Sequence, residues 1–200
     1  MHAYLLAGGR SRRMGFDKAL LPFGGKPLIL HLYRFLSNFL PTFVVTKEEK
    51  ADSYRSLGIE NLITDGFEVQ SPLAGIVTGL RHSPFEKNLF FAVDLPLLCP
   101  RLVEFLKGRP PKGKVFGIVP EVGGKLHFTA AVYLKSFLPA AEKALSENRL
   151  SLKQFLDRFE VVREGELLRE GIKPECLLNL NRPEDLRRLE EFQRARWASS

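Results

Sequence analysis

The chain opens with a short apolar run that passes directly into a loop of glycines and basic side chains. The run is Tyr4-Leu5-Leu6-Ala7, and the loop begins with Gly8-Gly9. In α/β proteins, a strand that ends in a glycine-bearing loop places backbone N–H groups against phosphates. Between residues 10 and 26 the charged side chains are Arg10, Arg12, Arg13, Asp17, Lys18 and Lys26. Arginine forks and lysine point charges beside such a loop favour a polyphosphate ligand.

Two common phosphate-binding motifs are absent from this loop. The dinucleotide motif G-x-G-x-x-G is excluded because Gly8-Gly9 continues as Arg-Ser-Arg-Arg. The P-loop motif G-x-x-x-x-G-K-[ST] is excluded because Gly9 and Gly15 are one residue too far apart, and Phe-Asp-Lys follows. A basic surface loop on an ordinary α/β domain is the alternative interpretation. The order of these residues taken together favours the phosphate site.

Length and composition are those of one ordinary globular domain. The chain has 200 residues, of which 44% are hydrophobic and 26% charged, so we expect a single domain over residues 1–200. The net charge of +7 indicates an anionic partner but not its kind. We expect no signal peptide and no membrane-spanning segment, and therefore a cytoplasmic protein without a membrane partner. Cys99 and Cys176 are expected to be reduced thiols, because their spacing fits neither a disulfide framework nor a zinc site.

Apolar runs of strand length alternate with longer helix-like segments along the chain. This alternation predicts a Rossmann-like three-layer sandwich, with a mostly parallel sheet and helices on both faces. Gly123-Gly124 predicts a hairpin-like excursion with at least one antiparallel strand. The expected strands are 2–7, 43–46, 61–65, 89–94, 115–120, 128–134, 161–163 and 176–180. The expected helices are 28–40, 51–57, 71–82, 100–107, 136–147, 151–159 and 184–197.

Two aspartates close expected strands, where ligands bind in open α/β sheets. Asp65 ends one strand, and Asp94 ends the most apolar one, before Leu95-Pro96. A carboxylate at that place can hold a divalent cation that bridges substrate phosphates. The alternative is that Asp94 only caps the following turn. His127 has no evident partner in the sequence and is expected to be structural.

The run from Leu6 to Ile29 resembles a known signature. It reads LAGGRSRRMGFDKALLPFGGKPLI, which closely resembles the nucleotidyltransferases that load a nucleoside monophosphate onto a phosphorylated acceptor. Within that group the chain is most similar to the molybdenum cofactor guanylyltransferases. The double glycine in Leu6-Ala7-Gly8-Gly9 is similar to that of the guanylyl-transferring members, whereas cytidylyl-transferring relatives more often have Ala-Ala-Gly. Matching elements at the start, middle and end extend the resemblance over nearly the whole chain.

The resemblance implies a reaction and its participants. GMP would pass from GTP to the terminal phosphate of molybdopterin, or of its molybdenum form, with Mg²⁺ as cofactor and pyrophosphate as product. Transient contacts with proteins that supply and receive the cofactor are expected, and no contact with nucleic acid. Lys18 and Arg13 are the implied catalytic residues, and Asp94 of the Val-Asp-Leu-Pro run is the implied metal ligand. The implied nucleotide-binding residues are Leu6, Ala7, Gly8, Gly9, Arg12, Lys18, Asp65 and Asp94.

Guanine recognition is assigned by the resemblance to Asp65, which precedes the element Pro72-Leu73-Ala74-Gly75. A carboxylate can accept hydrogen bonds from N1–H and the exocyclic amine of guanine, a donor pair that adenine and cytosine do not present together. Some relatives have asparagine where this chain has Thr46, which leaves a second polar contact to the nucleoside in doubt.

The run Leu178–Leu186 resembles the C-terminal element Asn-x-Asn-x-Pro-Glu-Asp-Leu of the same family. The resemblance implies a role of Asn179 and Asn181 on the acceptor or metal side. Asn181 would also cap a helix with Pro183 in its first turn, which is the structural alternative.

Two other classes of function stay open. A sibling enzyme would use CTP or a sugar phosphate with the same first loop. A non-catalytic nucleotide- or nucleic-acid-binding module would use the basic loop alone, but Lys18 and Asp94 are both present. One tryptophan and four tyrosines also give little base-stacking surface. A nucleotidyltransferase is therefore the favoured prediction.

Overall fold

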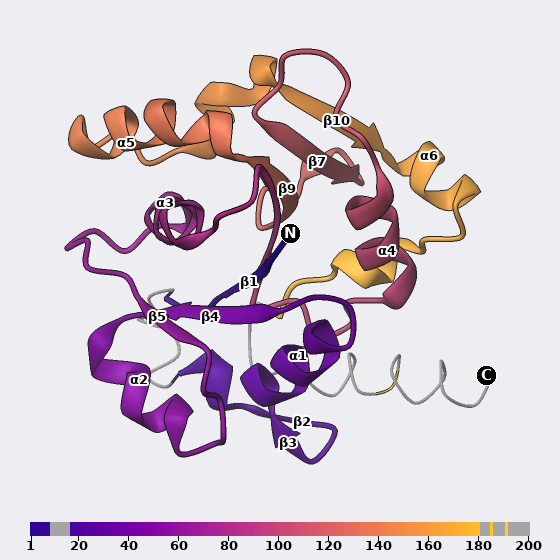
Figure 1. The fold of residues 1–200 in the computed structure, drawn as a ribbon. Helices are drawn as coiled ribbons and strands as arrows, with labels where there is room; N and C mark the ends of the chain where they lie inside the picture. Colours follow the sequence, from indigo (N-terminus) through magenta and orange to yellow (C-terminus); the bar gives the residue numbers. More distant parts are fainter. Residues whose placement is uncertain (9–16, 181–184, 186–190, 192–200) are drawn as a thin grey trace.

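The described part of the chain forms one eight-stranded sheet. The computed structural model describes residues 1–8, 17–180, 185 and 191 (Figure 1). The strands of the sheet are β1 (Ala3–Leu6), β4 (Thr42–Thr46), β5 (Leu62–Thr64), β6 (Lys87–Ala92), β7 (Gly117–Val122), β8 (Lys125–Leu126), β9 (Ala130–Leu134) and β10 (Phe159–Arg163). Their order is β10-β7-β9-β6-β1-β4-β5, with β8 paired to β7 off this path.

The sheet is mostly parallel. β1 lies between β6 and β4 and runs parallel to both, and the pairs β4–β5 and β10–β7 are parallel too. β9 runs antiparallel to both of its neighbours, β6 and β7. The turn at Gly123-Gly124 joins β7 to the short antiparallel strand β8, after which the chain returns as β9. The prediction of an antiparallel excursion at these glycines is therefore confirmed.

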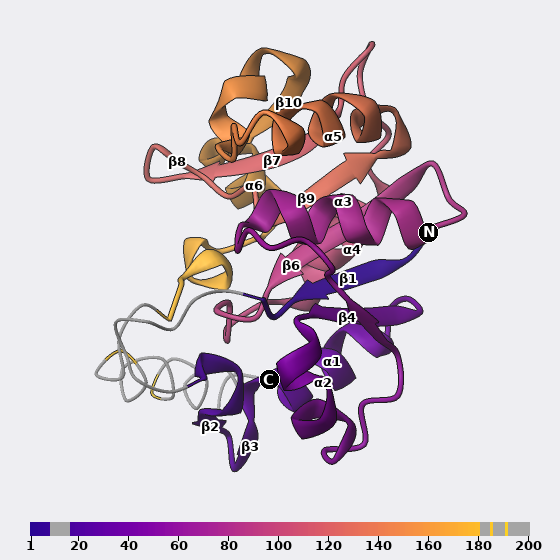
Figure 2. The ribbon, with the colours of Figure 1, turned by 90° about the vertical axis from the view of Figure 1, so that its left-hand side faces the viewer.

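Helices cover both faces of the sheet. The α-helices are α1 (Leu28–Ser37), α2 (Glu48–Arg55), α3 (Pro72–His82), α4 (Pro100–Gly108), α5 (Leu138–Ser146) and α6 (Glu164–Arg169). Leu5 of β1 packs with α1 and α4 in one apolar cluster, and its neighbour Tyr4 packs with α3 and α5 in another. Successive side chains of a strand point to opposite faces, so β1 contributes to both layers. Figures 1 and 2 show α3 and α5 together on one side of the sheet. The predicted three-layer sandwich is confirmed.

Helix α3 begins as the sequence predicts and packs unusually close to the sheet. The hydroxyl of Ser71 accepts a hydrogen bond from the Ala74 N–H at 3.2 Å, and Pro72 occupies the first turn. A Cβ atom at Gly75 would lie 2.9 Å from Leu6 Cδ2, and one at Gly79 would lie 2.6 Å from a ring atom of Phe90. These glycines therefore let the helix approach β1 and β6, and its first turn lies beside the end of β1.

Several predicted elements differ from the structure. Residues 174–177 form the 3₁₀ helix η4 (Pro174–Leu177) and not the start of a strand, and residues 151–159 form mainly the 3₁₀ helix η3 (Leu152–Arg158). Cys176, Leu177 and Leu180 are buried without strand pairing, so their apolar pattern reflects burial alone. The predicted helix 184–197 lies outside the described residues, apart from two isolated positions.

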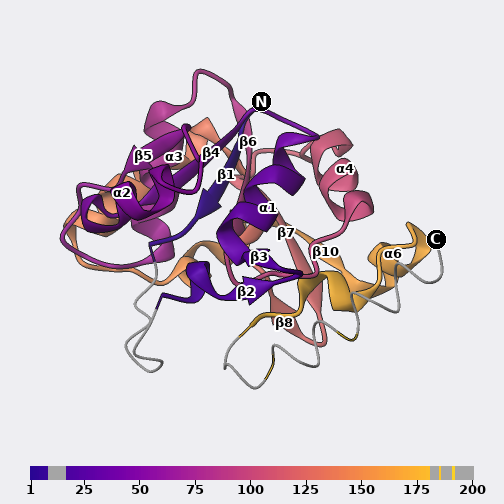
Figure 3. The ribbon, with the colours of Figure 1, turned by 90° about the horizontal axis from the view of Figure 1, so that it is seen from below.

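A small hairpin between the first loop and α1 was not predicted. Strands β2 (Pro22–Phe23) and β3 (Lys26–Pro27) pair antiparallel around Gly24-Gly25. Figure 3 shows this hairpin beside α1. It follows the short 3₁₀ helix η1 (Lys18–Leu20), so the segment that carries Lys18 is continuous with a folded unit.

Cys99 and Cys176 form a disulfide, so the prediction of reduced thiols is wrong. The fold brings their Cα atoms to 5.4 Å, although 77 residues separate them in the chain. A separation of that length gives no sequence signal for pairing. The bond fastens η4 to the residue that precedes α4. In the described part of the chain, no helix is long and apolar enough to cross a membrane.

Candidate nucleotide-binding site

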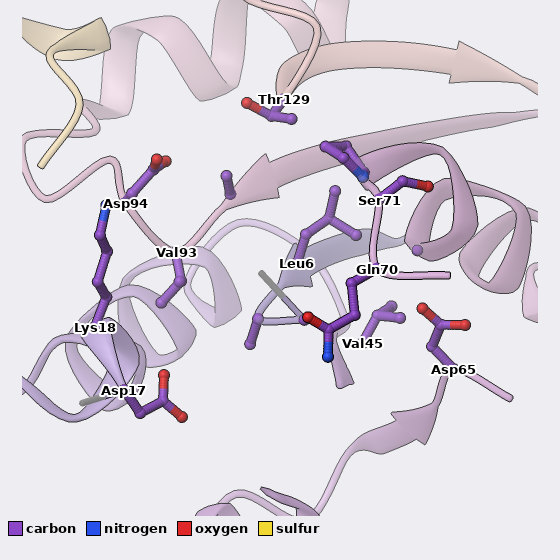
Figure 4. Close-up of a pocket in the computed structure, with 15 residues that line it drawn as sticks. Leu6, Asp17, Lys18, Val45, Asp65, Gln70, Ser71, Val93, Asp94 and Thr129 are labelled. Atoms are coloured by element: carbon purple, nitrogen blue, oxygen red, sulfur yellow. The ribbon is translucent and has the colours of Figure 1, made fainter. Parts of the chain in front are cut away.

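A cavity of about 340 Å³ opens at the carboxyl ends of β1, β4 and β6 (Figure 4). In parallel α/β sheets this edge is where ligands bind. The volume lies in the range of small-molecule sites. The lining residues are Leu6, Ala7, Gly8, Asp17, Lys18, Val45, Asp65, Gln70, Ser71, Pro72, Gly75, Ala92, Val93, Asp94 and Thr129.

Most of the described residues that the sequence singled out lie in this one cavity. They are Leu6, Ala7, Gly8, Lys18, Asp65 and Asp94. Asn179 is not in the lining but contacts Asp94, as described below. The remaining predicted positions, Gly9, Arg12, Arg13 and Asn181, lie outside the described residues, as does Arg10. Gln70, Ser71 and Thr129 also line the cavity and were missed as site residues. For Ser71 the capping pattern was a usable signal.

Asp94 is tied to the segment that follows η4. The amide of Asn179 donates a hydrogen bond to Asp94 Oδ1 at 3.0 Å. Lys125 Nζ in turn donates to Asn179 Oδ1 at 2.6 Å. The backbone N–H of Leu180 donates to the carbonyl oxygen of Asp94 at 2.7 Å. The segment 178–180 therefore holds both the backbone and the carboxylate of Asp94.

Lys18 lies at the same end of the cavity as Asp94. Its ammonium group donates to the carbonyl oxygen of Leu180 at 3.0 Å, and Figure 4 shows the side chain extended toward Asp94. Burial raises the pKa of the Asp94 carboxyl, and the Asn179 hydrogen bond and the charges of Lys18 and Lys125 act in the opposite direction. The Asp94 carboxylate can hold a divalent cation, and the ammonium groups of Lys18 and Lys125 nearby can attract the negative oxygen atoms of a phosphate.

Asp17 fixes the backbone that carries Lys18. Its Oδ1 accepts a hydrogen bond from the N–H of Ala19 at 3.1 Å, which caps η1. Its Oδ2 accepts one from the hydroxyl of Tyr54 at 2.7 Å and lies 3.1 Å from Lys50 Nζ. Tyr54 and Lys50 belong to α2. Asp17 therefore joins the turn of Lys18 to a neighbouring helix, a contact that the sequence alone did not indicate.

The hydroxyl of Tyr54 should stabilise this connection measurably. Tyr54 is completely buried. This burial, and secondarily the contact with Asp17, raises the pKa of its hydroxyl. We expect Tyr54→Phe to lower the free energy of unfolding by about 1.5–3 kcal/mol, because a hydrogen bond to a charged acceptor is lost. Denaturant unfolding of this variant beside the matched control Tyr33→Phe on α1 measures the effect. Equal stability of both variants would show that the contact contributes nothing.

Asp65 lies at the opposite end of the cavity from Asp94 (Figure 4). It is 7% exposed, and its backbone N–H donates to the carbonyl oxygen of Thr46 at 2.7 Å. Its Oδ1 accepts a hydrogen bond from the N–H of Phe67 at 3.0 Å, and its Oδ2 lies 3.2 Å from Lys47 Nζ. The carboxylate is therefore ion-paired and oriented at the cavity edge.

His127 is buried in the connection between β8 and β9. Burial, and secondarily the charge of Lys125, lowers the pKa of His127 to about 4. The imidazole is consequently neutral at physiological pH.

Comparison with known proteins identifies the family. Residues 3–162 match the model of the MobA-like NTP transferase domain. The chain belongs to this family. It is therefore a nucleotidyltransferase, as the sequence predicts.

Relatives of the MobA-like chain agree over nearly its full length. It is 35% identical over 187 residues to a probable molybdenum cofactor guanylyltransferase of Carboxydothermus hydrogenoformans, covering 92% of each chain. It is 28% identical to a molybdenum cofactor guanylyltransferase of Vibrio cholerae, covering 91% of this chain and 87% of that one. The crystal structure of molybdopterin-guanine dinucleotide biosynthesis protein A from Archaeoglobus fulgidus superposes with a TM-score of 0.82 at 25% identity, covering 98% and 100% of the two chains. The predicted resemblance is confirmed.

Proposed function

We propose that this enzyme transfers GMP from GTP to the terminal phosphate of molybdopterin, or of its molybdenum form. An oxygen of that phosphate forms a bond to the α-phosphorus of GTP, and the bond from the α-phosphorus to the bridging oxygen of pyrophosphate breaks. Pyrophosphate leaves with the electron pair, and the product is a guanine dinucleotide form of the cofactor. The names of the relatives support this choice of donor and acceptor.

The observation that carries the proposal is that charged residues lie at both ends of the cavity. Lys18 and Asp94 lie at one end and Asp65 at the other (Figure 4). Leu180 contacts both residues of the first end, because its carbonyl accepts from Lys18 and its N–H donates to the Asp94 backbone. A nucleotide with its base near Asp65 and its α-phosphate near Lys18 fits this arrangement.

The reaction needs no covalent enzyme intermediate, so positioning and charge neutralisation supply most of the rate. We assign to Lys18 the stabilisation of negative charge on the α-phosphate as pyrophosphate departs. The N–H and C=O groups at the end of β1 line the base and ribose, and Asp65 accepts from guanine. Asn179 acts on the acceptor side through its contact with Asp94. The proposal extends to positions outside the described residues, namely Gly9, Arg12, Arg13 and Asn181.

Mg²⁺ is the proposed cofactor, and the residues present fit it. Magnesium is usually held by one or two carboxylates together with substrate phosphates. Asp94 supplies a partly buried carboxylate at the phosphate end of the cavity. Among the described residues no group of three or more His, Cys, Asp or Glu side chains could hold a metal, so phosphate oxygens and water would complete the coordination. When bound, the cation supplies Lewis-acid stabilisation of the phosphate oxygens.

The direct test is turnover by the purified protein. With Mg²⁺ and molybdopterin present, we expect GTP to release pyrophosphate and to yield the guanine dinucleotide, identified by its mass. CTP, UTP and ATP should release little pyrophosphate. A preference for CTP or UTP would assign the protein to a sibling branch. Nucleotide binding without pyrophosphate release from any of the four would favour a non-catalytic module.

The wider setting is proposed on the same basis. We propose that residues 1–200 form a single nucleotidyltransferase domain that works in the cytoplasm. It would contact the cofactor-supplying and cofactor-receiving proteins transiently and would not bind nucleic acid. Disulfides are rare in cytoplasmic proteins except in hyperthermophiles. Whether the Cys99–Cys176 pair is oxidised or reduced in the cell therefore tests the proposed location.

A further inference from the structure

Lys47 is a buried lysine whose ammonium group lies inside one loop of the cavity wall. It follows β4 directly and is 6% exposed. Its Nζ donates to the carbonyl oxygens of Asp65 and Val69, each at 3.4 Å, and to that of Phe67. The same Nζ lies 3.2 Å from Asp65 Oδ2. All of these partners belong to residues 65–69.

The loop that surrounds Lys47 connects β5 to α3 and forms the wall at one end of the cavity. Asp65, Gln70 and Ser71 of this connection line the cavity. The carbonyls of alternate residues, 65, 67 and 69, converge on the ammonium group, so the loop curls around it. Burying a lysine is costly unless the charge is paired and its hydrogen bonds are made. Here one carboxylate and three carbonyl oxygens meet that requirement, and they define one shape for the loop.

The Asp65 carboxylate keeps acceptor capacity for a ligand. Its two oxygens together offer about four lone-pair sites. The Phe67 N–H takes one site on Oδ1, and the Lys47 ammonium faces Oδ2. The contacts therefore fix the plane of the carboxylate and leave some of its lone-pair sites available to a ligand. Lys47 itself is not among the lining residues of the cavity.

We propose that Lys47 is a positioning residue for base selection. By gathering residues 65–69 around its ammonium group, it holds the Asp65 carboxylate in the orientation that accepts from N1–H and the exocyclic amine of guanine. This inference rests on the proposed function of Asp65 and deepens it. A lysine with a merely structural role would stabilise the loop but would not discriminate between nucleotides that differ only in the amine.

The test compares GTP with ITP, which lacks the exocyclic amine, in calorimetric binding experiments with Mg²⁺. For Lys47→Met we expect GTP affinity to fall about tenfold or more and ITP affinity to fall by a clearly smaller factor, because GTP loses two hydrogen bonds to the Asp65 carboxylate and ITP, which keeps only N1–H, loses one. The turnover number at saturating GTP should stay near that of the wild type, because Lys18 and Asp94 lie at the other end. The double variant Lys47→Met/Asp65→Asn should discriminate no worse than Asp65→Asn alone, because the two residues act as one unit.

Lys135 provides a matched control. Its Nζ also donates to backbone carbonyls, those of Leu80 at 2.6 Å and Ser83, at the end of α3 distant from the Ser71 cap. Lys135→Met should lower stability in denaturant unfolding and leave the ratio of GTP to ITP affinity unchanged. If Lys47→Met does not fold, Lys47→Gln, which keeps a donor without the charge, enters the same comparison and should also lose discrimination.

The outcomes separate this inference from the proposed function. Equal weakening of GTP and ITP by the Lys47 variant, or unchanged discrimination, overturns the role of Lys47. If wild-type protein does not discriminate between the two nucleotides, or Asp65→Asn does not reduce discrimination, guanine recognition by Asp65 fails as well. Loss of discrimination in Asp65→Asn but not in the Lys47 variant overturns the inference alone.

Discussion

Replacement of Asp94 by asparagine should lower the rate of guanylyl transfer by about 10³-fold or more and leave the protein at least as stable as the wild type. Asp94 is the proposed metal ligand and lies with Lys18 at the phosphate end of the cavity. Removal of one preorganised electrostatic group typically lowers the rate by about 10²–10³-fold. Loss of the cation from the phosphates adds to that effect. Initial rates at saturating GTP measure the change.

The expected stability follows from the direction of the pKa shift of Asp94. Burial raises the pKa of this carboxyl in the folded protein, so folding favours its protonated form. Above the folded-state pKa the ionised side chain therefore lowers the free energy of unfolding, and asparagine removes this penalty. Asparagine also keeps an oxygen that can accept from Asn179. Denaturant unfolding at neutral pH should give a midpoint equal to or above that of the wild type.

An exposed aspartate serves as the control for this substitution. The side chain of Asp52 on α2 is 96% exposed and pairs with Arg55, so Asp52→Asn should keep the wild-type rate. Transfer at the wild-type rate by Asp94→Asn would contradict the role proposed for Asp94. A large loss of stability in that variant would instead contradict the account of its burial.

Reduction of the Cys99–Cys176 disulfide should produce the largest loss of stability. The bond closes a loop of 77 residues, and the chain-entropy model gives about 4.5 kcal/mol for a loop of that length. For a chain of this size the corresponding fall in the unfolding temperature is roughly 10 °C. Function should change as well, because Asn179 and Leu180 follow Cys176 closely and contact Asp94 and Lys18.

Thermal unfolding with and without dithiothreitol measures this effect. The wild type should lose stability on reduction, and the variant Cys99→Ala/Cys176→Ala should be insensitive to the reductant. Transfer activity followed in parallel should fall on reduction of the wild type. An unfolding temperature that does not respond to reductant would contradict a stabilising disulfide.

The sequence predicts the features that depend on local pattern. The apolar run that ends at Asp94 and the serine–proline start of α3 depend on burial and capping within a few residues. Their predicted positions are therefore close to those in the structure. The alternation of elements then places the ends of β1, β4 and β6 at one edge, where Asp65 and Asp94 line the same cavity.

Features that depend on the tertiary fold could not be predicted from the sequence. The pairing of Cys99 with Cys176 and the enclosure of Lys47 by residues 65–69 join distant or irregular segments, for which spacing gives no signal. Residues 176–180 were predicted as a strand from their apolar side chains. In the structure the N–H groups of Cys176 and Leu178 donate to carbonyls three residues earlier in the chain, and only Leu180 bonds to Asp94 and Lys18; none of these bonds joins a neighbouring strand. Apolar pattern reports burial and leaves the hydrogen-bond partners open.

Nucleotide selectivity in binding tests the central claim most directly. Calorimetric titration with GTP, CTP, UTP and ATP in the presence of Mg²⁺ should show tight binding of GTP alone. Asp65→Ala should abolish that preference while the protein stays folded. Comparable binding of CTP or UTP by the wild type, or an undiminished preference for GTP in Asp65→Ala, would contradict a guanine site in this cavity.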